Sequence, residues 1–136
     1  MDVNTTLDIA YSGMTAESAR LKVIAENLAN ADSTAATPGG EPYRRRLVTF
    51  SDVFDRTIHA DKVEVGGIVP DRSAFGKKYD PGHPAADAQG YVLTPNVNPI
   101  TELIDMRDAQ RSYDANLNVI DAVKAMVSRT IDLLHG

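Results

Sequence analysis

The chain of 136 residues contains no cysteine and no tryptophan, and aromatic residues make up only 6% of it. The lack of cysteine excludes disulfide frameworks, cysteine-based zinc sites and thiol nucleophiles. Acidic residues outnumber basic ones, with 19 Asp and Glu against 14 Lys and Arg. This excess of negative charge argues against nucleic acid as a partner. No apolar run approaches the roughly 18 residues that cross a bilayer, and residues 1–6 lack the basic and apolar segments of a signal peptide. These absences alone predict a cytosolic protein.

Proline and glycine are nearly absent from both ends of the chain. All seven prolines lie between Pro38 and Pro99, and seven of the nine glycines lie between Gly39 and Gly90. Both ends can therefore form long helices, whereas the middle is interrupted. We predict an N-terminal helix region in residues 1–37, a Pro/Gly-rich β or irregular insertion in 38–98, and a C-terminal helix region in 99–136. The fold class is mainly α with a small β-rich insertion.

The first helix is predicted over residues 5–31. Thr5 followed by Asp8 fits a capping box, in which the hydroxyl and the carboxylate satisfy free amide donors. Apolar residues then recur three and four positions apart, which is typical of a coiled-coil seam. The seam comprises Leu7, Ala10, Met14, Leu21, Ile24, Leu28 and Ala31, with Glu17 as its one polar interruption.

The last helix is predicted to begin at Pro99, with Asn98 as its cap. Over residues 99–134 it would form a rod of roughly 54 Å at 1.5 Å per residue. Its seam comprises Leu103, Met106, Gln110, Tyr113, Leu117, Ile120, Lys124, Val127, Ile131 and Leu134.

The two helices are predicted to pair as an antiparallel coiled coil. When the position numbers of facing residues sum to 141, Leu28 faces Tyr113 and the other apolar layers also match. The same register places Glu17 opposite Lys124, and matched polar layers are a known way to fix register. Sliding by one heptad would leave the Glu17 carboxylate desolvated without a partner, which is costly.

A second apolar stripe lies on each helix, away from the seam. It comprises Ile9, Ala16 and Val23 in the first helix and Val119, Met126 and Leu133 in the last. One interpretation is a broad core face that packs on the insertion. The other is lateral packing against neighbouring subunits, because a helix that is apolar on two sides is usually buried on two sides. We favour the second interpretation, which predicts a protein that polymerises helically.

The insertion is predicted to contain strands at residues 43–50, 62–69 and 91–94, a turn at 80–84, and a bulge or turn at Gly66 and Gly67. Its one basic run is 44–46, three consecutive arginines. This run is either a solvated strand or loop, or a contact with the acidic helical ends of neighbouring subunits or another anionic surface.

Residues suited to catalysis are sparse. Asp80, His83 and Asp87 could be drawn as a metal cluster, but two prolines surround His83 and a solvated turn is the better interpretation. No nucleophile elbow, phosphate loop or dinucleotide fingerprint is present. We therefore predict no catalytic residue, no metal and no cofactor.

Several motifs resemble one protein family. Residues 12–14 (SGM) and 20–34 (RLKVIAENLANADST) closely resemble the N-terminal signature of the bacterial flagellar axial proteins, which form the rod, the hook and the hook-associated segments. Residues 111–117 (RSYDANL) resemble the matching C-terminal motif. The insertion, through 39–45 (GGEPYRR), 79–84 (YDPGHP), 90–92 (GYV) and 95–98 (PNVN), is most similar to the proximal-rod members of the family.

The resemblance implies a structural subunit and not an enzyme. It implies helical stacking into a hollow shaft that transmits torque and conducts exported subunits, located in the basal body as a rod that spans the periplasm. The implied partners are copies of itself, other rod proteins, the hook–basal-body adaptor, the membrane-ring complex and the flagellar type III export apparatus, which carries subunits out unfolded and without a cleaved signal peptide. A soluble coiled-coil adaptor that forms no filament is the competing interpretation.

Five residues of the matched motifs are carried over from the resemblance. Asn27 and Asn30 either cap the first helix or bond a neighbouring chain, and Gly13 permits close helix approach. Arg111 and Asn116 belong to the C-terminal motif.

Overall fold

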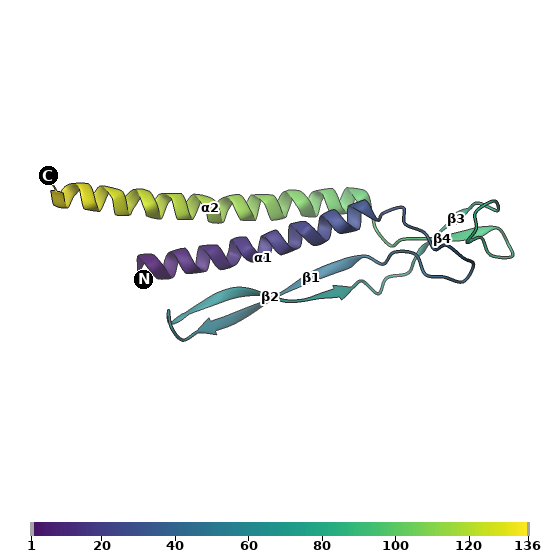
Figure 1. Ribbon diagram of the computed structural model, residues 1–136, viewed down its shortest axis with the longest axis horizontal. Coiled ribbons are helices and arrows are strands. Elements are labelled where there is room, and N and C mark those ends of the chain that lie inside the picture. The colour runs from purple at the N-terminus through teal and green to yellow at the C-terminus, as the bar shows by residue number, and fades with distance from the viewer. Residues whose placement is uncertain (1, 136) are drawn as a thin grey trace.

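The computed structural model describes residues 2–135, which form two long helices and two small antiparallel sheets. In chain order the elements are α1 (Val3–Ala29), β1 (Arg46–Asp55), β2 (Ala60–Pro70), β3 (Gly76–Tyr79), β4 (Tyr91–Thr94) and α2 (Pro99–His135). Figure 1 shows an elongated molecule in which both chain ends lie at one end and the β3–β4 sheet lies at the other. The mainly α fold with a small β-rich insertion is as predicted. Among residues 2–135, no helix combines the length and the apolar character needed to cross a membrane.

The start of α2 is capped as predicted. The Asn98 Oδ1 accepts hydrogen bonds from the amides of Ile100 at 3.0 Å and Thr101 at 3.4 Å, and Pro99 occupies the first helical position. The capping box predicted for α1 is wrong. That helix begins at Val3 after Asp2, which makes no side-chain cap bond, so Thr5 already lies inside the helix and is not its cap.

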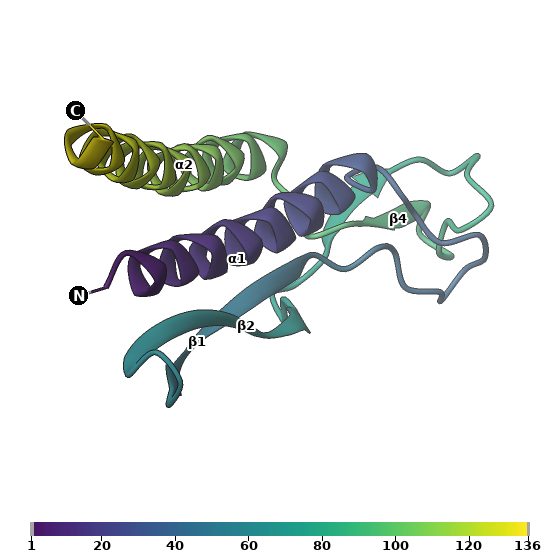
Figure 2. The same ribbon diagram turned by 60° about the vertical axis from the view of Figure 1, so that its left-hand side comes forward.

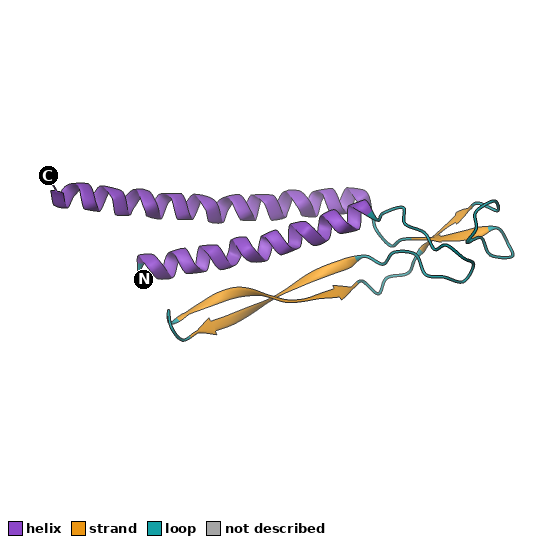
Figure 3. Ribbon diagram, viewed as in Figure 1, coloured by secondary structure: helices purple, strands orange, loops and turns teal. Residues whose placement is uncertain are grey.

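Helix α1 is packed on two sides. It lies antiparallel to α2 along one side and against the β1–β2 hairpin along another, as the two views in Figures 1 and 2 agree. Its buried side chains are Ala10, Ala16, Val23, Ile24 and Asn27. Among the described helices and strands, α2 packs only on α1, and most of its side chains are exposed. Figure 3 shows the orange strands of the β1–β2 hairpin beside α1 rather than beside α2.

The helix register differs from the predicted one. Gly13 lies beside Asn116, so closely that a Cβ at Gly13 would be 2.7 Å from the Asn116 Nδ2, and Asn27 is hydrogen-bonded to Glu102. The position numbers in both pairs sum to 129 rather than 141. Glu17 is therefore not opposite Lys124. Instead, its carboxylate lies 3.7 Å from the Arg20 guanidinium in the next turn of α1, and the Lys124 side chain is exposed.

This register changes which α2 residues face α1. The buried α2 side chains are Glu102, Ala109, Ile120 and Val123, and Tyr113 is half-buried. The remaining residues of the predicted α2 seam are exposed in the single chain, namely Leu103, Gln110, Leu117, Lys124, Val127, Ile131 and Leu134, except Met106, which is half-buried. Because Val3 lies level with the region of Met126, the last turns of α2 extend beyond the start of α1 (Figure 1).

The β1–β2 hairpin is longer than predicted and contains the predicted bulge. Thr49 pairs with Gly67, and the next residue, Phe50, pairs with Val65, so Gly66 has no partner across the ladder. An extra residue on one strand is a β-bulge, which glycine tolerates well. Strand β1 begins at Arg46 rather than Tyr43, because Tyr43 and Arg44 lead from α1 to the hairpin.

The second sheet joins β3 and β4. Strand β4 matches its predicted bounds, but β3 was not predicted, because its sequence, GKKY, has little β propensity. The ring of Tyr79 packs edge-on against that of Tyr91, with the centroids 5.3 Å apart. The predicted turn at residues 80–84 connects this sheet to the loop before β4, and it is observed.

Candidate functional site

A buried polar cluster joins α1, α2 and the start of the hairpin. Its centre is Asn27, of which 1% is exposed. The Asn27 Nδ2 donates to the Arg46 carbonyl at 2.9 Å and to the Glu102 carboxylate at 3.1 Å. The Asn27 Oδ1 accepts from the Arg46 amide at 2.9 Å and from the Tyr43 hydroxyl at 2.9 Å. All four hydrogen-bonding positions of this amide are thus occupied within the chain.

Glu102 and Arg45 extend this cluster into α2. Glu102 is also only 1% exposed, and its second carboxylate oxygen accepts from the Arg45 Nε. The same guanidinium pairs with Asp105 at 3.1 Å and with Asp71 at 3.4 Å. Burial disfavours the charged form of Arg45, but its hydrogen bond with Glu102 and the nearby carboxylates outweigh this and raise its pKa. Three carboxylates therefore hold one cation at the junction of the elements.

The polar cluster also fixes the segment between β2 and β3. Asn96 accepts from the Arg45 amide at 2.8 Å and donates to the Asp71 and Ser73 carbonyls. The pKa of Asp71 is lowered, first by the Ser73 amide and then by Arg45. Arg44 donates to the Asp71 carbonyl at 2.9 Å, and its guanidinium carbon lies 4.1 Å from the centre of the Phe75 ring, in cation–π geometry.

The three arginines therefore have partners within their own chain. Arg44 and Arg45 bind the insertion and α2, and Arg46 lies 3.5 Å from Glu26 of α1. The solvated alternative fits only Arg46, which lies in β1 with 53% of its side chain exposed, and a contact with neighbouring subunits stays a prediction. The missed signal is the pair Glu102 and Asp105, whose spacing of three places both carboxylates on one helix face, where a single arginine can reach them.

The motif asparagines behave differently from each other. Asn30 caps the end of α1, where its Nδ2 donates to the Glu26 carbonyl at 2.9 Å. The Asn27 side chain does not cap α1, and its four hydrogen bonds are all made to groups of its own chain in the polar cluster. Gly13 lies so close to Asn116 that a Cβ there would be 2.7 Å from the Asn116 Nδ2, and this Nδ2 donates to the Ser112 carbonyl at 3.1 Å. Arg111 is exposed.

The second apolar stripe is divided between two environments. In α1 it is largely covered by its own chain: Val23 is 3% exposed and lines a cleft with Leu47 and Phe50 of β1, and Ile9 is half-buried. The core-face interpretation therefore holds for α1. In α2, Val119 is 42% exposed, Met126 57% and Leu133 84%.

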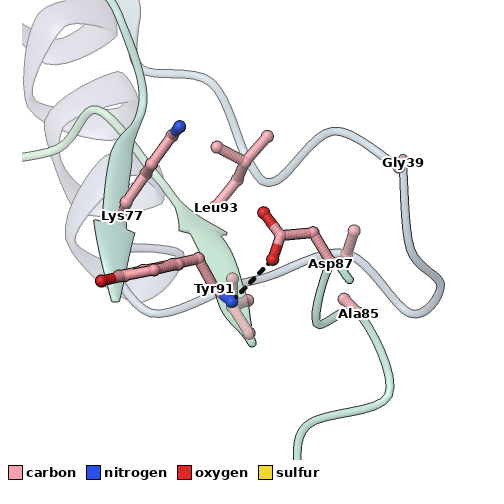
Figure 4. A pocket seen from close by; sticks show the side chains of 9 residues that line it. Gly39, Lys77, Ala85, Asp87, Tyr91 and Leu93 are labelled. Carbon is pink, nitrogen blue, oxygen red and sulfur yellow. Dashed lines mark hydrogen bonds between the residues drawn. The ribbon is translucent and has the colours of Figure 1, made fainter. Parts of the chain in front are cut away.

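One pocket lies beside the β3–β4 sheet, and its lining contains no paired catalytic groups. Lys77, Tyr91 and Leu93 form one side of it, and Ala85, Asp87 and Gly39 form the other (Figure 4). The Asp87 Oδ1 accepts from the Tyr91 amide at 2.8 Å and the Gln89 amide at 2.9 Å, so this carboxylate stabilises a turn.

His83 stabilises the neighbouring loop. Its Nδ1 accepts from the Ala85 amide at 3.0 Å, and its Nε2 is 3.2 Å from the Thr34 hydroxyl. Within residues 2–134, no group of three histidine or acidic side chains is arranged to hold a metal ion. His135 lies outside the residues whose side chains the structure describes.

Two family models match the two helical ends of the chain. The model described as "Flagella basal body rod protein" matches residues 7–36, and the model described as "Flagellar basal body rod FlgEFG protein C-terminal" matches residues 88–133. Curated relatives match nearly the whole chain. The flagellar basal-body rod protein FlgC of Agrobacterium fabrum is 51% identical over 128 residues, which cover 94% of this chain and 92% of the relative. The chain belongs to the FlgC family of flagellar basal-body rod proteins.

More distant members of the FlgC family match over a similar extent. The FlgC protein of Escherichia coli O6:H1 is 42% identical over 126 residues, with 93% of each chain covered. That of Borreliella burgdorferi is 37% identical over 154 residues and covers both chains fully. The polar cluster and the close contact of Gly13 with Asn116 therefore lie within sequence that the family matches.

Proposed function

We propose that this chain is a subunit of the proximal part of the flagellar basal-body rod, a hollow shaft that transmits torque and conducts exported subunits. Membership of the FlgC family makes it a structural subunit of the basal-body rod and not an enzyme. The proximal position and the torque-bearing role rest on the resemblance of the insertion motifs at residues 39–45, 79–84, 90–92 and 95–98 to the proximal-rod members. The partners are other basal-body components. Specifically, we propose copies of this chain, other rod proteins, the hook–basal-body adaptor and the membrane-ring complex.

The exposed side of α2 supports assembly with neighbours. Large apolar side chains on this helix include Leu117 at 40% exposed, Met126 at 57% and Leu134 at 80%. Exposed contiguous apolar surface of this kind marks an interaction site in a soluble protein. We propose that the α2 stripe (Val119, Met126 and Leu133) and the end of the α2 seam (Leu117, Val127, Ile131 and Leu134) pack against helices of neighbouring subunits, in coiled-coil fashion.

Export of the chain from the cytosol is part of the same proposal. The chain would leave the cytosol unfolded through the flagellar type III export apparatus, without a cleaved signal peptide, and complete its helices on assembly in the periplasm. Helices whose apolar faces are covered only by neighbours gain a large part of their stability at assembly, because the ordering cost is then offset by burial. The division at residues 37/38 and 98/99 would separate the helical assembly region from the insertion.

Complementation tests this function. A strain that lacks the corresponding rod gene should regain motility when it expresses this chain, and the chain should copurify with isolated basal bodies. Far-ultraviolet circular dichroism then distinguishes the rod subunit from the soluble adaptor. A rod subunit should gain helix content when it assembles, whereas a monomer that is already fully helical and absent from basal bodies would establish the adaptor instead.

A further inference from the structure

A groove runs along the solvent-exposed side of α1, beside its contact with α2. Its volume is about 410 Å³, and it is lined by Tyr11, Met14, Thr15, Ser18, Ala19, Lys22 and the α2 residue Tyr113. The Tyr11 side chain is 48% exposed, and the Lys22 side chain is exposed. Among the side chains of residues 2–134, Lys22 makes no ion pair. We refer to these lining residues as the α1 groove.

A complementary line of side chains runs along α2. Asp108, Ala115, Val119, Ala122 and Met126 follow one another at intervals of seven, four, three and four positions, so they lie on one helix face. All five are exposed, whereas Ile120 and Val123 on the α1-facing side are buried. Asp108 is in no ion pair within the described chain. We refer to these five residues as the α2 line.

The groove and the line match in height along the molecule. In the observed register, facing positions sum to 129. Lys22 is therefore nearly level with Asp108, and Tyr11 is nearly level with Val119. A second copy placed alongside at the same height would bring the Lys22 ammonium to the Asp108 carboxylate and the Tyr11 ring to Val119. The small Ala115 would then be nearly level with Met14 and Thr15 of the groove.

From this match we propose that the α1 groove of one copy receives the α2 line of a second copy, side by side in the same layer of the assembly. The inference rests on the proposed function and specifies which faces of the subunits meet. The contact is heterologous, because different surfaces of the two copies take part, so it propagates from copy to copy. A contact of this kind closes into a ring or continues as a helix, and either arrangement can surround a central axis.

Cysteine crosslinking tests the contact directly, because the natural chain contains no cysteine. Tyr11→Cys and Val119→Cys are combined in one chain, expressed in the complemented strain, and oxidised in isolated basal bodies. The expected result is a ladder of dimers and higher multimers of this chain on a non-reducing gel. The matched control combines Tyr11→Cys with Asp114→Cys, which places the second cysteine on another exposed face of α2, and it should give no ladder.

Charge exchange provides a second measurement. Lys22→Asp or Asp108→Lys should each lower the crosslinking yield roughly two- to fivefold, as expected for the loss of a surface ion pair, and the two together should restore it. Lys124→Asp, remote from both surfaces, should leave the yield unchanged. Failure of the parent chain to enter basal bodies would refute the proposed function. A motile strain whose basal bodies contain the cysteine variant but yield no ladder, or only products with one copy of this chain, would refute this contact alone.

Discussion

Replacing Asn27 by alanine should destabilise the fold far more than replacing Asn30, although both asparagines belong to one short motif. The Asn27→Ala variant leaves the Tyr43 hydroxyl, the Arg46 amide and one Glu102 oxygen without their partner. A buried polar group left unpaired costs about 1–3 kcal/mol. Water can reach Tyr43 and Arg46, which are partly exposed, but Glu102 is 1% exposed. We therefore expect the free energy of unfolding to fall by about 2–4 kcal/mol.

Asn30→Ala is the matched control. Its side chain bonds the Glu26 carbonyl and Ser33 at the exposed end of α1, so its loss should cost about 1 kcal/mol or less. Urea titration followed by circular dichroism at 222 nm measures both variants, with the same stabilising osmolyte present throughout so that each has a folded baseline. Equal losses in the two variants, or a loss below about 1 kcal/mol for Asn27→Ala, would show that the polar cluster does not hold the helices together.

Three further predictions concern the core, the exposed helix face and the hairpin. Ile24→Asp should unfold the isolated chain, because Ile24 is 5% exposed. Leu117→Asp, at a position 40% exposed, should leave the circular dichroism of the isolated chain unchanged but abolish motility. Motility in strains that carry either variant would contradict the assignment of Ile24 to the core and of Leu117 to a subunit contact. Met126→Glu should leave the monomer spectrum unchanged but block incorporation into basal bodies, and wild-type assembly would show that this face meets no neighbour. The pKa of Asp55 is lowered from 3.8 to about 2 by the Lys62 ammonium, 2.7 Å away, and the Thr57 amide, so its stabilisation of the hairpin is complete above pH 3.8 and is lost as the pH falls through about 2. Titration of the Asp55 carboxyl carbon by NMR measures this value, and a midpoint near 3.8 would refute the pairing.

The two helices could be predicted from the sequence because the signals that specify them are local. The apolar spacing of α1 and α2 and the Asn98–Pro99 start depend on residues within one or two turns of each other. The bulge at Gly66 could be predicted in the same way, because glycine inside a strand pattern often marks a bulge. The capping box at Thr5 failed for the opposite reason. Its pattern was present, but the helix continued past it to Val3.

The helix register could not be predicted by matching apolar layers. A glycine beside Asn116 and an asparagine bonded to Glu102 determine it, and neither pair counts as an apolar layer. Asn27 and Glu102 can be buried only because Tyr43, Arg45 and Arg46 from the insertion complete their hydrogen bonds. The register therefore depends on contacts between three separate segments, which periodicity within one helix does not contain.

The bulge at Gly66 has a consequence for crowded copies of this chain. A two-stranded ribbon presents an unpaired backbone edge on each side, and such edges can join those of other chains into continuous sheets. An unpaired residue in the ladder locally disrupts its repeat and increases its twist, so another ribbon cannot align along its full length. The charged side chains of Asp52, Lys62 and Glu64 add repulsion or desolvation cost to such pairing. These features oppose aggregation of the chain through its β1–β2 hairpin, and they leave the helices as the surfaces through which copies assemble.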